Sequence, residues 1–118
     1  MRSDVGRFFE GRLLDTIKLL QVIYDIGCGA GFDVDCWIEG KEMVFGRAGV
    51  GQGRGFLRVI VLETSAILLF PRGHKLFDPA KRGKGPRNSQ TRVHVRDPAD
   101  IDLYVRRLID EAYATDEF

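Results

Sequence analysis

Basic side chains are concentrated in one stretch of the chain, between residues 72 and 96. The stretch contains a single acid, Asp78, and its basic residues are Arg72, Lys75, Lys81, Arg82, Lys84, Arg87, Arg92 and Arg96. Such a local excess of positive charge suits a phosphate, a nucleotide or a nucleic-acid backbone. Gly83 and Gly85 could let backbone N–H groups approach an anion. The alternative interpretation is a solvated surface loop that binds nothing.

Both histidines of the chain, His74 and His94, lie in this basic stretch. Neither has a cysteine or a cluster of carboxylates nearby in the sequence, so the spacing does not indicate a metal site. Ser89 lies in the same stretch, but nucleophilic catalysis needs a serine and a histidine that are close in space. The pattern therefore favours binding over catalysis.

A glycine-rich segment, YDIGCGAGF at residues 24–32, is similar to the first motif of S-adenosylmethionine-dependent methyltransferases. In those enzymes the glycines follow a parallel strand and precede a helix of a doubly wound sheet. Here the preceding residues have helical periodicity and the following ones read as strands. We therefore interpret the segment as a turn between a helix and a strand.

Acidic residues surround the single tryptophan: Asp33, Asp35 and Glu39 flank Cys36 and Trp37. Asp33, Asp35 and Trp37 would share one face of a strand that began early enough. One interpretation is an edge strand guarded by charges. The other is a pocket wall in which Trp37 supplies an apolar surface and a carboxylate supplies a polar contact.

The elements that must position these residues can be predicted from periodicity. Apolar residues spaced by three and four predict an amphipathic helix over about 5–26, with its buried face formed by Phe9, Leu13, Ile17, Leu20 and Tyr24. Gly27 would be the left-handed residue just past its end. A second helix is predicted from Asp97, its N-cap, through Pro98 to about Ala114.

Short segments rich in β-branched and aromatic residues lie between the helices. They predict strands at 34–39, 42–48, 56–62, 65–70 and 91–96, with a tight hairpin at Gly40–Lys41. In the last strand Thr91, Val93 and Val95 face one way, and Arg92, His94 and Arg96 face the other. We expect one α+β domain over residues 1–118, with N- and C-terminal helices packed on an antiparallel sheet of about five strands.

Residues 56–112 resemble the YdhG-like family of small bacterial proteins, a domain of unknown function. The matching residues are Phe70, Arg72, Gly73, Leu76, Asp78, Pro79, Gly83 to Gly85, Arg92, Val93, Asp100, Ile101 and Asp102. The resemblance implies a fold with helices on an antiparallel sheet, and some relatives are described as frataxin-like iron chaperones. A frataxin-like iron chaperone would need a ridge of acidic side chains whose oxygen atoms bind the iron. The first helix offers Glu10, Asp15 and Asp25 against Arg7, Arg12 and Lys18.

Composition limits the remaining possibilities. The 118-residue chain has 18 Lys and Arg against 17 Asp and Glu, so any electrostatic signal must be local. Its two cysteines, eight positions apart, are expected to be reduced thiols. Apolar runs are too short for a membrane span, and the N-terminus lacks a signal peptide. We expect a cytoplasmic protein without a membrane partner.

These observations favour a small, non-catalytic binding or accessory module with a pocket for an anion or small ligand between the sheet and the basic loop. The candidate binding residues are Trp37, Arg72, Lys75, Lys84, Arg87, Arg92 and His94. No cofactor, metal or catalytic residue is predicted. The expected partner is a small anionic ligand or a protein, and two copies could pair through exposed strand edges. The alternatives are a frataxin-like iron chaperone and a weak nucleic-acid binder.

Overall fold

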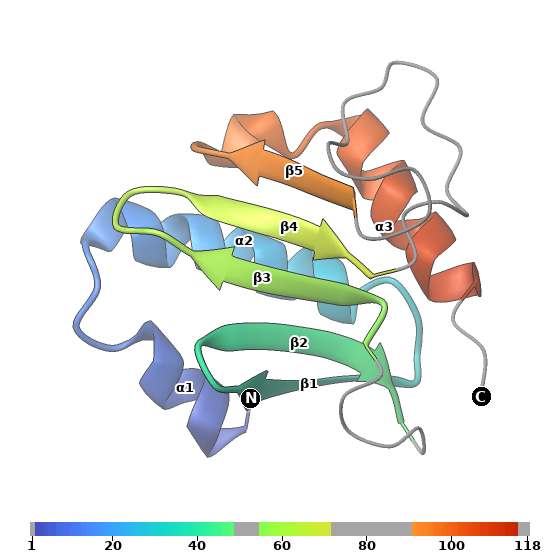
Figure 1. Cartoon of the computed structure of the whole chain (residues 1–118), viewed down its shortest axis with the longest axis horizontal. Helices are drawn as coiled ribbons and strands as arrows, with labels where there is room; N and C mark the ends of the chain where they lie inside the picture. The colour runs from blue at the N-terminus through green and yellow to red at the C-terminus, as the bar shows by residue number, and fades with distance from the viewer. Residues whose placement is uncertain (1, 49–54, 72–90, 116–118) are drawn as a thin grey trace.

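A five-stranded antiparallel sheet forms the centre of the protein (Figure 1). The computed structural model describes residues 2–48, 55–71 and 91–115. The strands lie side by side in chain order: β1 (Val34–Glu39), β2 (Glu42–Arg47), β3 (Leu57–Val61), β4 (Ala66–Phe70) and β5 (Thr91–Val95). The predicted α+β fold is therefore confirmed, and the strand boundaries differ from the predicted ones by at most one residue.

Helices α2 (Leu14–Cys28) and α3 (Leu103–Thr115) lie behind the sheet in Figure 1, and α1 (Ser3–Phe9) lies against β1. The core fills the space between sheet and helices. It takes one face of every strand, including Cys36, Phe45, Val59, Leu68 and Val93. The alternate residues point to the opposite face, which we call the open face because none of the described helices covers it.

The predicted single helix over 5–26 is wrong, because the segment forms two helices separated by residues 10–13. Gly11 has φ +76°, a left-handed conformation that glycine adopts without steric cost and that no α-helix continues through. Leu13, predicted on the buried face, is 53% exposed as the N-cap of α2. Arg12 bridges the break, since its Nε donates to the carbonyl oxygen of Phe8 at 2.8 Å.

Gly27 does not end its helix in a left-handed conformation, as the sequence predicted. The helix continues to Cys28 and is capped by Gly29 at φ −78°. Gly27 is instead buried against β2, where an added Cβ would lie 2.5 Å from the ring of Phe45. The absence of a side chain at residue 27 therefore sets how closely α2 approaches the sheet.

The YDIGCGAGF segment consequently has no methyltransferase context. Its first five residues, 24–28, complete a helix that packs on an antiparallel sheet, and β1 begins at Val34. Within the described residues no strand precedes the glycines, and a strand rather than a helix follows them. The interpretation as a turn between a helix and a strand is confirmed for residues 29–32, whereas residues 24–28 belong to the helix itself.

The remaining turns and caps match the prediction in part. Gly40 has φ +60° in the tight hairpin between β1 and β2. Asp97 accepts from the N–H of Ala99, but it caps a short 3₁₀ helix (Pro98–Asp100) rather than α3 itself. Asp102, the residue before α3, caps that helix, because its Oδ1 accepts from the N–H of Val105 at 3.0 Å. The described part of the chain contains no helix with the length and apolarity that a membrane span requires.

Replacing Gly27 by alanine should destabilise the protein by about 1–3 kcal/mol, because the new Cβ collides with the Phe45 ring in a packed core. The free energy of unfolding in urea measures the effect. Gly6→Ala is the matched control, since nothing lies within 4 Å of its added Cβ in α1. That control should be neutral or stabilising, and equal stability of the two variants would contradict the close contact.

Candidate functional site

The predicted binding residues that the structure describes share the open face but lie at its two opposite edges. Trp37, Arg92 and His94 all point to it, whereas Arg72, Lys75, Lys84 and Arg87 lie outside the described residues. Trp37 is in β1 and the other two are in β5, at opposite edges of the sheet. Four strand spacings of about 4.8 Å separate them by roughly 19 Å. A small ligand therefore cannot contact both edges at once.

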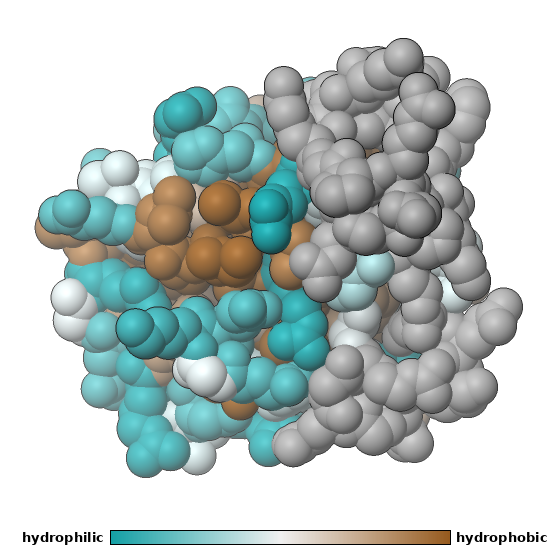
Figure 2. All heavy atoms as spheres, viewed as in Figure 1, coloured by the Kyte–Doolittle hydropathy of each residue, from teal (hydrophilic) through white to brown (hydrophobic). Residues whose placement is uncertain are grey.

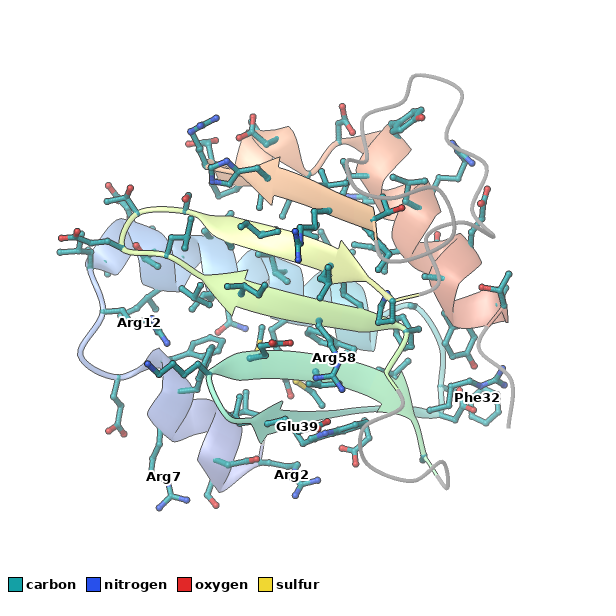
Figure 3. All side chains as sticks on the ribbon, viewed as in Figure 1. Arg2, Arg7, Arg12, Phe32, Glu39 and Arg58 are labelled. Atoms are coloured by element: carbon teal, nitrogen blue, oxygen red, sulfur yellow. The ribbon has the colours of Figure 1, made fainter. Side chains whose placement is uncertain are left out.

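At the β1 edge of the open face, Arg58 lies between two carboxylates. Its guanidinium is 3.4 Å from Glu39 and 3.4 Å from Glu42, and Figure 3 shows Arg58 and Glu39 on the same side of the sheet. Glu39 also accepts from the indole N–H of Trp37 at 2.7 Å. Trp37 is only 4% exposed. This edge is thus acidic, internally hydrogen-bonded and without an exposed aromatic surface.

Apolar side chains occupy the middle of the open face. Ile60 and Ile67 are directly paired across β3 and β4 and are half-buried. Leu62, at the end of β3, is 42% exposed. Figure 2 shows a hydrophobic patch on this face of the molecule, bordered by hydrophilic residues. The patch separates the acidic β1 edge from the β5 edge.

The β5 edge is basic. Arg92 and His94 in β5, and Arg96 just after it, are all exposed and alternate along the strand. Among the described residues no carboxylate forms a salt bridge with Arg92 or Arg96, although other arginines of the structure have such partners. The predicted alternation of this strand is confirmed, with Val93 and Val95 buried on the core side.

Ser65 holds the imidazole of His94. Its hydroxyl lies 2.8 Å from Nε2 of His94, a distance typical of a nucleophile and its base. Ser65 is only 6% exposed, and within the described part of the chain no carboxylate orients the other ring nitrogen. We therefore interpret Ser65 as a residue that positions His94. Sequence reasoning missed this contact because it depends on the register of β4 against β5.

Asp33 belongs to a different cluster. It accepts from the hydroxyl of Tyr113 in α3 and from Nε of Arg47 at 3.0 Å. The Arg47 guanidinium also stacks 4.6 Å from the centre of the Tyr113 ring. The Tyr113 hydrogen bond and then the Arg47 cation lower the pKa of Asp33. This cluster fixes the end of α3 to the strands and leaves Asp33 no role on the open face.

The thiols of Cys28 and Cys36 are free. Burial raises the pKa of both, so neither is an activated nucleophile. Burial likewise raises the pKa of the neighbouring Tyr24 to about 12. No group of three or more His, Cys, Asp or Glu side chains within the described ranges could hold a metal ion.

Two surface hollows lie among the described residues, one beside the end of β5 and one between helices. The larger, of about 810 Å³, is lined by the start of α2 and by Thr64, Arg96 and Pro98. The smaller, of about 490 Å³, lies between α2 and α3 and is lined by residues that include Asp25, Arg106 and Asp110. Arg96 borders the larger hollow and also ends the basic row of β5, so only this hollow adjoins the candidate site.

Comparisons of this chain with protein-family models, with curated proteins and with solved structures found no match.

Replacing Tyr113 by phenylalanine should lower the stability at neutral pH, because it removes the hydrogen bond to the Asp33 carboxylate. Since the folded state lowers the pKa of Asp33, this stabilisation is present above the unfolded pKa of about 4 and is lost as the pH falls through the folded value. Urea unfolding between pH 7 and pH 3 should show the two proteins converging in acid. A difference independent of pH would contradict the contact with an ionised Asp33.

Proposed function

We propose that the protein is a non-catalytic binding module that holds an anionic ligand along the β5 edge of the open face. The observation that supports this is the row of Arg92, His94 and Arg96, exposed at alternate positions and without a described counter-ion. Alternate residues of a strand are about 6.5–7 Å apart. A ligand with several negative groups can contact them together.

The neighbouring residues favour an extended anion over a buried one. The three basic side chains border the half-buried Ile67, which offers apolar contact next to the charges. Exposed charges in water attract a single anion weakly, so affinity must come from several contacts and should fall as salt is added. The basic residues predicted between 72 and 90 directly precede β5 in the chain and would add to this potential.

The alternative functions have less support. Single-stranded nucleic acid stacks its bases on aromatic side chains, and the aromatic residue described on the open face, Trp37, is buried. A frataxin-like iron chaperone would require clustered oxygen ligands, and the described residues contain no such cluster. The resemblance to the YdhG-like family remains a prediction and implies no particular ligand.

Arg92→Gln should weaken anion binding because it removes one of the two arginine charges of the β5 row, neither of which has a described carboxylate partner. Inorganic phosphate, a nucleoside triphosphate and an oligoglutamate should be titrated at low salt while the melting temperature is followed. We expect at least one of them to raise it, less so at high salt. Arg106→Gln is the control, because Arg106 is an exposed arginine in α3 beside the smaller hollow. The proposal fails if no anion changes the melting temperature, or if both variants lose the response equally.

The reactivity of Ser65 tests whether the protein is non-catalytic. A fluorophosphonate probe labels serines that an adjacent base activates. We expect no labelling, because Ser65 is 6% exposed and His94 has no described carboxylate partner. Labelling that disappears in Ser65→Ala would show instead that the pair is a catalytic nucleophile and base.

A further inference from the structure

The two edges of the sheet differ in how their outward N–H groups are satisfied. At β1 the N–H of Ile38 donates to Asp4 of α1 at 3.1 Å, and the N–H of Cys36 donates to Asp35 at 2.9 Å. Carboxylates and helix α1 therefore occupy this edge. An edge strand blocked in this way cannot accept another strand.

The orientation of the β5 backbone follows from the neighbouring hairpin. The N–H of Leu62 donates to the carbonyl of Ser65 at 2.8 Å, so odd-numbered residues of β4 bond to β3. Because antiparallel strands alternate their bonding direction, the even-numbered residues of β4 bond to β5, where Leu68 faces Val93. The N–H and C=O groups of Arg92 and His94 consequently point away from the sheet.

These outward groups have no recorded partner among the described residues. The carboxylate of Asp100 accepts from the N–H of Arg96 at 2.8 Å, just beyond the end of β5. That bond confirms that the even-numbered residues of this segment face outward. No described backbone or side-chain group bonds to the outward N–H groups of Arg92 and His94. The β5 edge is therefore the unblocked edge of the described sheet.

We propose that an extended acidic peptide adds to β5 as a sixth strand. Its backbone would bond to the outward groups of Arg92 and His94, and its acidic side chains would alternate on the open face opposite the basic row. This inference depends on the proposed anion site and specifies its partner. A second copy of the chain is a poorer occupant, because pairing β5 with itself would place basic side chains opposite one another.

The added peptide needs a particular alternation of side chains. A strand presents every second side chain to the same face, so acids at alternate positions can contact Arg92, His94 and Arg96 together. The intervening residues would extend the core side of the sheet beyond Val93, where apolar side chains fit best. Main-chain bonds supply affinity and the side-chain alternation supplies specificity, as in other cases of strand addition.

The direct test compares three capped eight-residue peptides by fluorescence anisotropy at low salt. One alternates Glu and Val, one has the same composition in two blocks, and one alternates but is N-methylated at every second residue on its β5-facing edge. The loss of one hydrogen bond between peptide and protein weakens binding about fivefold. We expect the alternating peptide to bind at least fivefold more tightly than either control.

Amide hydrogen exchange identifies the bonded atoms. Binding of the alternating peptide should slow exchange at Arg92 and His94, and not at Ile38. Arg92→Pro should bind this peptide more weakly than Arg92→Gln, since both lose the charge but only proline lacks the N–H. The substitution leaves the ladder to β4 intact, because this N–H points outward. If Arg92→Pro does not fold, the exchange data and the N-methylated peptide decide the question.

The outcomes separate this inference from the proposed function. If phosphate, nucleotide and all three peptides fail to bind, the anion site itself is wrong. Strand addition is overturned if the alternating peptide, the peptide with its residues in two blocks and the N-methylated peptide bind equally well. It is also overturned if the amide hydrogens of Arg92 and His94 exchange at unchanged rates when the alternating peptide binds. In either case the site binds anions without adding a strand.

Discussion

The sheet can bury only one of its faces under the described helices, and most of the structure follows from that constraint. Helices α2 and α3 place their apolar residues, among them Leu20, Ile23 and Leu108, against the core side of all five strands. Each fully buried side chain of this size contributes about 1.5–3 kcal/mol relative to exposure. Gly27 allows α2 to approach β2 closely. The open face carries buried side chains such as Trp37 and Leu69, and it also carries the exposed Arg92 and His94 of β5.

The open face carries three zones that the strand order separates. An acidic, hydrogen-bonded group around Arg58 lies at β1, apolar residues lie over β3 and β4, and basic residues without a described carboxylate partner lie along β5. The arginine of the first zone is neutralised by Glu39 and Glu42, whereas Arg92 has no described carboxylate partner. Among the described residues of the open face, attraction for an external anion is therefore strongest at the β5 edge.

Much of the fold could be predicted because its signals are local. The alternation of Val93 with Arg92 and His94 identified both faces of β5, and Gly40 identified a hairpin. Features that depend on tertiary contact could not be predicted. Hydrophobic periodicity alone predicted one continuous helix that included Gly11. Nothing in the sequence shows that the Phe45 ring leaves no room for a side chain at residue 27.

The candidate site was predictable only in its composition. The sequence singled out Trp37, Arg92 and His94, and all three share the open face. Their separation across the sheet depends on strand order, and the contact between Ser65 and His94 depends on register, so neither could be read from the chain. The same register decides which backbone groups of β5 face outward.

Backbone amide shifts during an oligoglutamate titration, followed by two-dimensional NMR, would show directly whether an anion binds at the β5 edge. We expect the largest shifts on residues 91–96 and on Ile67, and we expect added salt to reverse them. Shifts confined to α2 and α3, or no shifts at low salt, would contradict an anion site at the β5 edge.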